Sequence, residues 1–267
     1  MVGCNCDEPK FELIVVHYTP FKYTLQVFEA GDNVIVTEKW KQYNRVVSVE
    51  DSPRRGLAVS EAVEIQKRLA QQVVKTGTLA SPRYVAGVDI SSRRGEHTAR
   101  AAAVVLSFPD LRLVETKTLE GPIDFPYVPG LLSFREAPLS AAVCARLENK
   151  PDVFLIDGQG FAHPRRCGFA CHLGLLLDKP TIGCAKSLLL GTFNDPGTKK
   201  GNYSQITDDG EVIGAAVRTR DAVKPVFVSI GNKIDLPGAI DIVLRCCRGF
   251  RIPEPLRLAH IHAGKTC

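Results

Sequence analysis

The sequence predicts an α/β fold in which helices flank a mixed central sheet. Two apolar runs, 84–91 and 153–157, are typical of buried strands, and each carries an acidic residue near its end. A helical pattern separates the second run from the next apolar run, which makes those two strands parallel. An open sheet of this kind places ligands beyond the carboxyl ends of its strands, so Asp89 and Asp157 are candidate site residues.

The other elements follow from spacing and from turn residues. Helices are expected where apolar residues recur every three or four positions, and Pro109-Asp110 indicates a short hairpin between two strands. In chain order we expect helix 61–75, strands 84–91, 101–108 and 111–119, helix 131–147, strand 153–157, helix 169–177, and then strands 181–185, 212–219 and 225–230 before helix 240–247.

Residues 1–55 are expected to form a small β-rich extension to a main domain over 56–267. Short strand patterns cover 11–18, 24–28 and 33–38, with Ala30-Gly31-Asp32 as a turn. The role of this extension stays open between an appended β-unit, a surface that binds a partner, and a segment unrelated to function.

Composition favours an intracellular protein with one substantial core. The chain has 267 residues, of which 45% are hydrophobic, and it lacks an apolar run of about 18 residues that could cross a membrane. No secretory signal is recognisable, so a cytoplasmic monomer without membrane contact is expected. The nine cysteines lack paired zinc-ligand spacing, which favours reduced thiols.

The charge balance is compatible with nucleic acid as a partner. The net charge is +5 and the pI is near 8.7. Acidic residues slightly outnumber basic ones in 1–55, so the basic surplus lies in the main domain, where phosphate contacts would be needed. A surplus of this size does not by itself identify the partner.

The segment after the strand 153–157 combines an acid, glycines and bases. Gly158 and Gly160 follow Asp157 and allow close approach of a ligand to the main chain, while His163 and the arginines after it add positive charge. The alternative is an ordinary Asp-Gly turn with solvated basic residues.

Two carboxylates on neighbouring strands would repel each other unless a cation lies between them. A divalent ion with oxygen ligands resolves this, and Mg²⁺ takes one or two carboxylates together with substrate phosphate. An alternative of equal weight is that Asp89 and Asp157 each cap a separate turn and bind no cation.

Residues 125–130 predict a stiff projecting loop. Pro126 and Pro129 fix the backbone on both sides of Tyr127 and Val128, which suits a wedge between stacked bases. The alternative is a Pro-rich turn with a tyrosine packed on the surface. The following segment 133–136 matches a helix capping box, so its glutamate could serve only as a cap.

Four strings in this order resemble the endonuclease V family, whose members cut nucleic acid beside deaminated purines such as inosine. The resemblance covers about residues 56–260, and the strings are VAGVD (85–89), PYVPGLLSFRE (126–136), DGQGFAHPRR (157–166) and LGLLLDKPTIGCAKS (173–187). It implies a ribonuclease H-like fold with a mixed five-stranded sheet.

The resemblance also implies residue roles. Asp89 and Asp157 would hold Mg²⁺, with Mn²⁺ as a possible substitute, and Glu136 would complete the acidic cluster. Lys186 matches the active-site lysine of the family, and His260 aligns with a C-terminal position that carries His or Asp. The reaction implied is hydrolysis of a phosphodiester bond on the 3′ side of inosine in DNA or RNA.

Base selection is implied by the same likeness. Loop 126–129 would hold the strands apart, and main-chain groups of the pocket would meet the flipped base and exclude the 2-amino group of guanine. The residues implied for substrate binding are Pro126, Tyr127, Val128, Pro129, Gly130, Leu132, Gly158, Gly160 and His163.

Two other functions remain open at this point. One is a non-cleaving module that binds inosine or nucleic acid, and the other is a ribonuclease H-like nuclease specific for flaps or junctions. One departure from the family pattern is Gly231-Asn232-Lys233, where members usually carry Gly-His-Arg or Gly-His-Lys. Because this histidine is missing, a contact that family members make near the substrate is in doubt.

Overall fold

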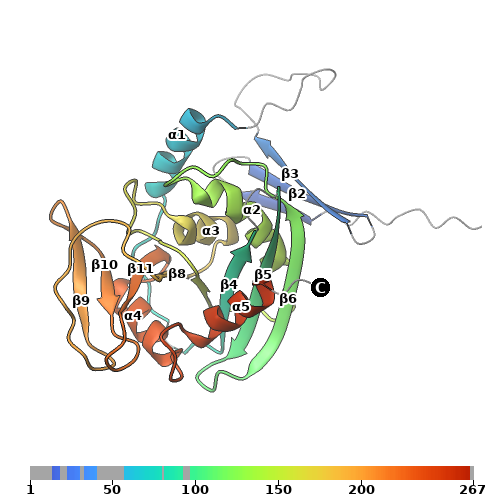
Figure 1. Cartoon of the computed structure of the whole chain (residues 1–267). Helices are drawn as coiled ribbons and strands as arrows, with labels where there is room; N and C mark the ends of the chain where they lie inside the picture. Colours follow the sequence, from blue (N-terminus) through green and yellow to red (C-terminus); the bar gives the residue numbers. More distant parts are fainter. Residues whose placement is uncertain are drawn as a thin grey trace, which may run out of the picture.

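The computed structural model describes residues 14–18, 23–30, 33–40, 57–79, 81–92 and 97–264. An eight-stranded sheet forms its centre, in the order β6-β5-β4-β7-β8-β11-β10-β9 (Figure 1). The strands are β4 (Tyr84–Ser91), β5 (Thr98–Ser107), β6 (Leu113–Pro122), β7 (Val153–Ile156), β8 (Thr181–Ala185), β9 (Tyr203–Asp208), β10 (Glu211–Val217) and β11 (Val226–Asn232).

Strand directions confirm the predicted mixed sheet and the ribonuclease H-like α/β class. The central strands β4, β7 and β8 run parallel, and all other pairs in this sheet are antiparallel. The sheet has eight strands instead of the expected five, because β9, β10 and β11 extend it. Strand β9 was not expected, since its sequence YSQITD is mostly polar and only one of its residues is buried.

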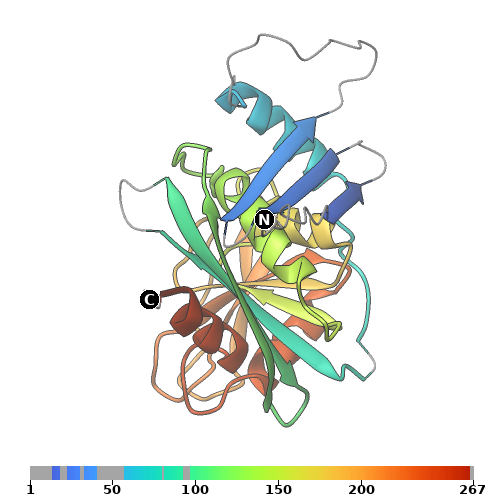
Figure 2. The same ribbon diagram turned by 90° about the vertical axis from the view of Figure 1, so that its right-hand side faces the viewer.

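Helices cover both faces of the sheet. They are α1 (Val59–Ala70), α2 (Leu132–Ala145), α3 (Phe169–Leu177), α4 (Leu236–Arg245) and α5 (Glu254–Gly264). Alternate residues of β5 point to opposite faces, so Ala103 joins a core with α2 and α3, whereas Val104 joins a core with α4 and α5. Figure 2 shows α2 and α5 on opposite sides of the sheet.

Helix α5 was missed, although Pro255 in its first turn and the acidic Glu254 are helix-start signals. The helix lies directly on β4 at Gly87, where an added Cβ would stand 2.1 Å from the carbonyl oxygen of Pro255. The glycine of VAGVD therefore lets the C-terminal helix approach the strand that carries Asp89.

The expected capping box at the start of α2 is wrong. The N-cap is Leu131, which makes no side-chain cap hydrogen bond. Ser133 lies inside the first turn, and its buried hydroxyl pairs with Nδ1 of His172 at 3.1 Å. Glu136 is thus not needed as a cap. Helix α4 also begins earlier than expected, because Asp235 accepts the Gly238 N–H at 2.7 Å and caps it.

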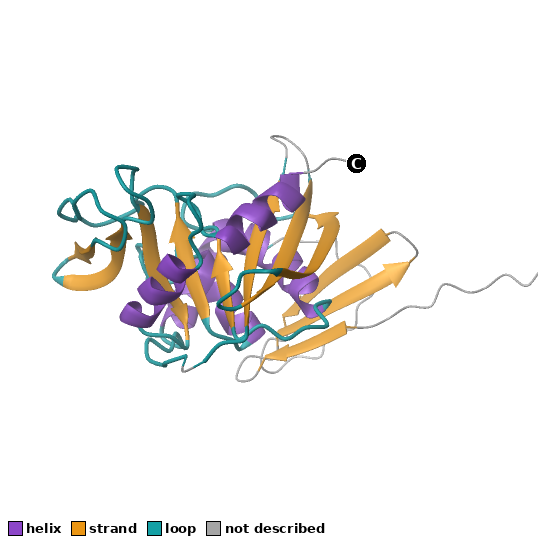
Figure 3. Cartoon of the chain, turned by 90° about the horizontal axis from the view of Figure 1, so that it is seen from below, coloured by secondary structure: helices purple, strands orange, loops and turns teal. Residues whose placement is uncertain are grey.

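The N-terminal β-pattern is confirmed for the described backbone. Strands β1 (Ile14–Tyr18), β2 (Tyr23–Ala30) and β3 (Asn33–Trp40) form an antiparallel three-stranded sheet apart from the main one (Figure 3). The expected start at residues 11–13 and the turn residues 31–32 lie outside the described residues. The division at residue 55 stays a prediction.

Two further expectations concern membrane-spanning segments and the state of the cysteines. Within the described residues, no helix is long and apolar enough to cross a membrane. The cysteines of the described part of the chain that lie in the main domain are free and buried.

Candidate active site

Asp89 and Asp157 lie side by side at the carboxyl ends of two central strands of the sheet. Strands β4 and β7 are parallel neighbours, and Val88 pairs with Ile156 in their register. Each acid directly follows one of these paired residues, so both carboxylates emerge at the same level of the sheet. The sequence-based placement of a site at the carboxyl ends of these strands agrees with this geometry.

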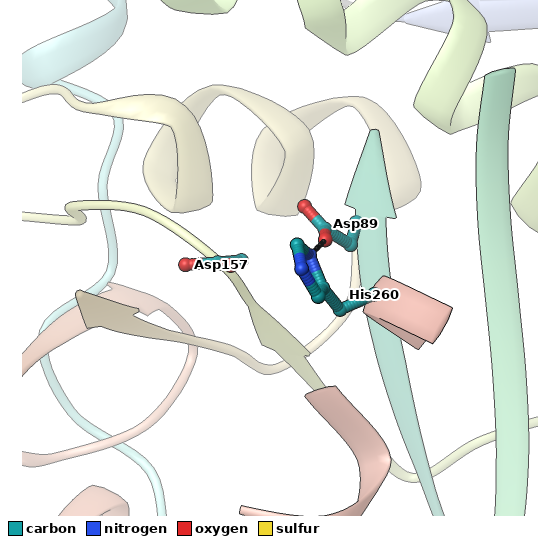
Figure 4. A group of neighbouring side chains, drawn as sticks. All are labelled: Asp89, Asp157 and His260. Atoms are coloured by element: carbon teal, nitrogen blue, oxygen red, sulfur yellow. Dashed lines mark hydrogen bonds and ion pairs between the residues drawn. The ribbon is translucent and has the colours of Figure 1, made fainter. Parts of the chain in front are cut away.

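His260 joins the two acids from α5 (Figure 4). Its Nδ1 lies 2.7 Å from Oδ2 of Asp89. One donor atom from each of Asp89, Asp157 and His260 lies within 4.8 Å of the others. Two carboxylates and an imidazole at this separation form a donor set that suits a divalent cation. His260, predicted as catalytic, thus lies among the candidate metal ligands.

Glu136 lies in the same electrostatic field. Its pKa is raised to about 8, mainly by burial and in smaller part by the charges of Asp89 and Asp157, while the Arg135 guanidinium opposes the rise. Burial and the charge of Asp157 also raise the pKa of Asp89. We name Asp89, Glu136 and Asp157 the acidic cluster. The basic groups beside it, Arg135 and His260, do not bring the pKa values of Glu136 and Asp89 back to their ordinary range. A further cation would therefore bind favourably.

Lys186 supplies one positive charge to the acidic cluster. It directly follows β8, and its Nζ lies 2.5 Å from Oδ2 of Asp157. The lysine that the family resemblance indicates thus lies next to one of the two acids.

The main chain around Lys186 is fixed by two side chains that sequence reasoning missed. The Arg251 guanidinium donates to the Lys186 carbonyl at 2.5 Å, and Gln159 Nε2 donates to the Ser187 carbonyl at 2.9 Å. Gln159 lies within DGQG and could have been noticed there, whereas no sequence signal indicates Arg251.

The loop 125–130, named the wedge loop here, projects one aromatic ring. Tyr127 is 72% exposed, and the prolines on either side of it are also exposed. Val128 instead packs against an apolar cluster that includes Phe125, Leu131 and Phe134. The loop is anchored by its apolar residues while the tyrosine side chain reaches solvent.

The predicted pocket glycines differ in what surrounds them. Gly130 has φ of +79°, and Leu132 beside it is 37% exposed. Gly160 is buried, donates its N–H to Ser229 Oγ at 2.9 Å, and would place a Cβ 2.1 Å from the Ile230 carbonyl oxygen. We therefore assign Gly160 to packing of the loop on β11, while half-buried Gly158 stays beside Asp157.

His163 is a buried neutral histidine against Gly130. Its pKa is lowered to about 4, mainly by burial and in smaller part by the Arg165 charge. The Arg165 N–H donates to Nδ1 of His163 at 3.1 Å, so the neutral ring carries its proton on Nε2, which faces Gly130.

The two arginines expected to place positive charge beside Asp157 contact other parts of the protein instead. Arg166 makes ion pairs of 2.8 Å with both Asp208 and Glu211, so it fastens the loop to the hairpin of β9 and β10. Arg165 points to the base of the wedge loop, where it donates to the Gly130 carbonyl at 2.6 Å.

Asn232 lies away from the acidic cluster. It is buried, accepts the Val74 N–H at 3.1 Å and donates to the Gly174 carbonyl at 3.3 Å. It pairs with Thr181 at the start of β8, the opposite edge from Lys186. Asn232 therefore joins internal elements of this structure, and the effect of the missing histidine on a substrate contact stays a prediction.

The raised pKa of Glu136 predicts a pH-dependent gain in stability for Glu136→Gln in the absence of metal. The folded pKa of about 8 lies above the ordinary 4.5, so this side chain's contribution is present below pH 4.5 and lost as pH rises through 8. One pKa unit corresponds to about 1.4 kcal/mol, so the excess of the variant's free energy of unfolding over the parent's should be about 4 kcal/mol larger near pH 9 than near pH 5. Urea titrations in EDTA at both pH values measure it, and an equal difference at the two would refute the charge assignment.

Comparisons with known proteins extend over most of the chain. The sequence model of the Endonuclease V family matches residues 67–261. Endonuclease V of Gloeobacter violaceus is 49% identical over 228 residues, covering 82% of this chain and 93% of that protein. The crystal structure of endonuclease V from Streptomyces avermitilis has a TM-score of 0.74 at 39% identity and covers 77% of this chain and 91% of its own.

A further solved structure contains nucleic acid. Endonuclease V of Ciona intestinalis, in complex with a 24-mer DNA that contains an inosine followed by a ribo-adenosine, has a TM-score of 0.69 at 35% identity. The likeness covers 77% of this chain and 95% of that one.

Proposed function

Because this chain belongs to the endonuclease V family, we propose that it is a Mg²⁺-dependent endonuclease that hydrolyses a phosphodiester bond on the 3′ side of inosine in DNA or RNA. Such an activity would serve DNA repair or the turnover of inosine-containing nucleic acid. The main support is the donor set of Asp89, Asp157 and His260, with atoms within 4.8 Å of one another and Lys186 alongside.

The residues present fit a divalent metal. Asp89 and Asp157 would be its carboxylate ligands, and His260 Nδ1 lies within the same set of donor atoms. Burial first, and neighbouring carboxylates second, raise the pKa values of Asp89 and Glu136, and a bound cation would stabilise the charged form of both side chains. When bound, Mg²⁺ supplies Lewis-acid stabilisation of phosphate charge and favours ionisation of water; Mn²⁺ could substitute.

Side chains of this protein would supply proton transfer and charge stabilisation. The Glu136 carboxylate, with its raised pKa, is suited to accept a proton from the attacking water. The Lys186 ammonium is held beside Asp157 and would offset negative charge as it develops on the phosphate. Arg251 and Gln159 fix the main chain at positions 186 and 187, which limits the movement of that ammonium.

Base selection would use the wedge loop and the main chain beside it. The exposed ring of Tyr127 suits insertion into a base stack, while Val128 keeps the loop anchored. Main-chain groups of Gly130, Leu132 and Gly158 would meet the extruded base. The complex of the Ciona intestinalis relative with inosine-containing DNA supports nucleic acid of this kind as the ligand.

A comparison of cleavage on four substrates tests the substrate class. End-labelled duplexes carrying inosine, guanosine or adenosine at one position, and a branched junction without inosine, would be incubated with Mg²⁺. We expect cleavage of the inosine strand alone. Cleavage of the junction with equal rates on all duplexes would favour a structure-specific nuclease, and tight binding of inosine without cleavage would favour a binding module.

Tyr127→Ala should reduce discrimination between inosine and normal duplex more than nonspecific affinity. An aromatic side chain stacked on bases contributes about 1–3 kcal/mol, so we expect roughly tenfold or more loss in selectivity. Parallel binding titrations on both duplexes measure this, with Tyr203→Ala as a control, since Tyr203 is 55% exposed on the edge strand β9. Equal losses on both duplexes would show that Tyr127 is no wedge.

A further inference from the structure

Gln66 is a buried polar side chain that the proposed chemistry does not use. It lies on α1, is 1% exposed, and contacts two segments far away in sequence. Its Nε2 donates to the Gly130 carbonyl at 3.0 Å and to the Cys167 carbonyl at 2.6 Å. Burying an amide without partners is costly, so the full use of its donors shows a specific place for this side chain.

Arg165 completes the arrangement from the other side. Its Nε donates to Oε1 of Gln66, and its Nη2 donates to the same Gly130 carbonyl at 2.6 Å. One carbonyl oxygen, at the end of the wedge loop, therefore accepts from both side chains. A charged donor makes the stronger of the two hydrogen bonds.

The apolar surroundings place α1 behind the wedge loop. Ala62, one turn before Gln66, is fully buried in a cluster with Phe125, Leu131 and Phe134. Helix α1 thus supports both ends of the loop, with apolar contacts along it and hydrogen bonds at Gly130. That glycine has φ of +79°, so its peptide orientation is specific, and the next residues lead into the segment proposed to meet the base.

We propose that Gln66 and Arg165 form a brace that fixes the Gly130 carbonyl and thereby sets the position of the wedge loop and the wall of the base pocket. These are positioning residues: they act through Gly130 and do not touch the reacting atoms. The inference rests on the proposed function, because it assigns the brace a part in choosing inosine over ordinary nucleotides.

The first test compares variants for inosine selectivity. Gln66→Met keeps the length of the side chain and removes its hydrogen bonds, and Arg165→Met removes the other half of the brace. Gln71→Met, at the exposed end of the same helix, is the control. We expect each brace variant to lose roughly tenfold in selectivity through KM, with kcat on inosine nearly retained, and the double variant to lose no more than the stronger single one.

The second test measures the loop without any reaction. Trp40 is the single tryptophan of the chain, so Trp40→Phe combined with Tyr127→Trp places one indole at the loop tip. Fluorescence anisotropy and acrylamide quenching then report its motion. We expect faster motion and stronger quenching when Gln66→Met or Arg165→Met is added, and no change with Gln71→Met.

The outcomes separate the brace from the proposed function. Unchanged motion of the indole in both brace variants would overturn the brace. So would a lower melting temperature with unaltered selectivity, or losses that multiply in the double variant. If the parent protein failed to distinguish inosine, the proposed function would fall, while the anisotropy result would still decide whether Gln66 and Arg165 hold the loop. Arg165→Met serves alone if Gln66→Met does not fold.

Discussion

Asp157→Asn and Asp89→Asn are each expected to reduce cleavage of inosine-containing strands by a factor on the order of 10³ or more. Each change keeps the shape of the side chain but removes one of the two carboxylates from the donor set shared with His260. Binding of the strand should persist or tighten, because one negative charge near the phosphate is lost.

Asp152→Asn is the matched control for this experiment. Its carboxylate accepts the N–H groups of Arg83 and Tyr84, at the end of β4 and β7 opposite to the acidic cluster. Single-turnover rates and gel-shift titrations should show full cleavage in the control and binding without cleavage in the other two. Turnover near the parent rate in Asp157→Asn or Asp89→Asn would refute the metal assignment.

Lys186→Met is expected to produce the second largest loss, roughly 10² to 10³ in kcat. The ammonium lies 2.5 Å from Asp157, and its main chain is fixed by Arg251 and Gln159. The loss should appear in kcat more than in KM, because the charge stabilises the transition state more than the bound strand.

Lys233→Met provides the comparison for Lys186→Met, since it also removes an ion-paired lysine. Its Nζ lies 2.6 Å from Asp178, which follows α3 and precedes β8, whereas Lys186 follows that strand. We expect the control to retain the parent kcat. A Lys186→Met variant with unchanged kcat and raised KM would instead identify this lysine as a contact for substrate binding.

The sequence was sufficient to predict the position of the two acids. A carboxylate next to a short apolar strand is legible because strand burial and strand ends both depend on local residue order. Once β4 and β7 pair in parallel, Asp89 and Asp157 follow neighbouring residues in the register. The family resemblance then supplied roles for Glu136, Lys186 and His260.

Long-range contacts were beyond sequence reasoning. His260 reaches Asp89 across 171 positions only because Gly87 lets α5 lie on β4. The links of Gln66 to Gly130 and Cys167 likewise depend on packing that no local pattern encodes. The false capping box shows the opposite error, in which a local motif matched while the tertiary structure used Ser133 to pair with His172.

The most direct test of the proposed function is cleavage of an end-labelled duplex with a single inosine, in Mg²⁺ and in EDTA, beside a duplex without inosine. The acidic cluster and the wedge loop predict one nick on the 3′ side of the inosine, present with Mg²⁺ and absent with EDTA. A nick that persists in EDTA, or equal cutting of the duplex without inosine, would contradict the proposal.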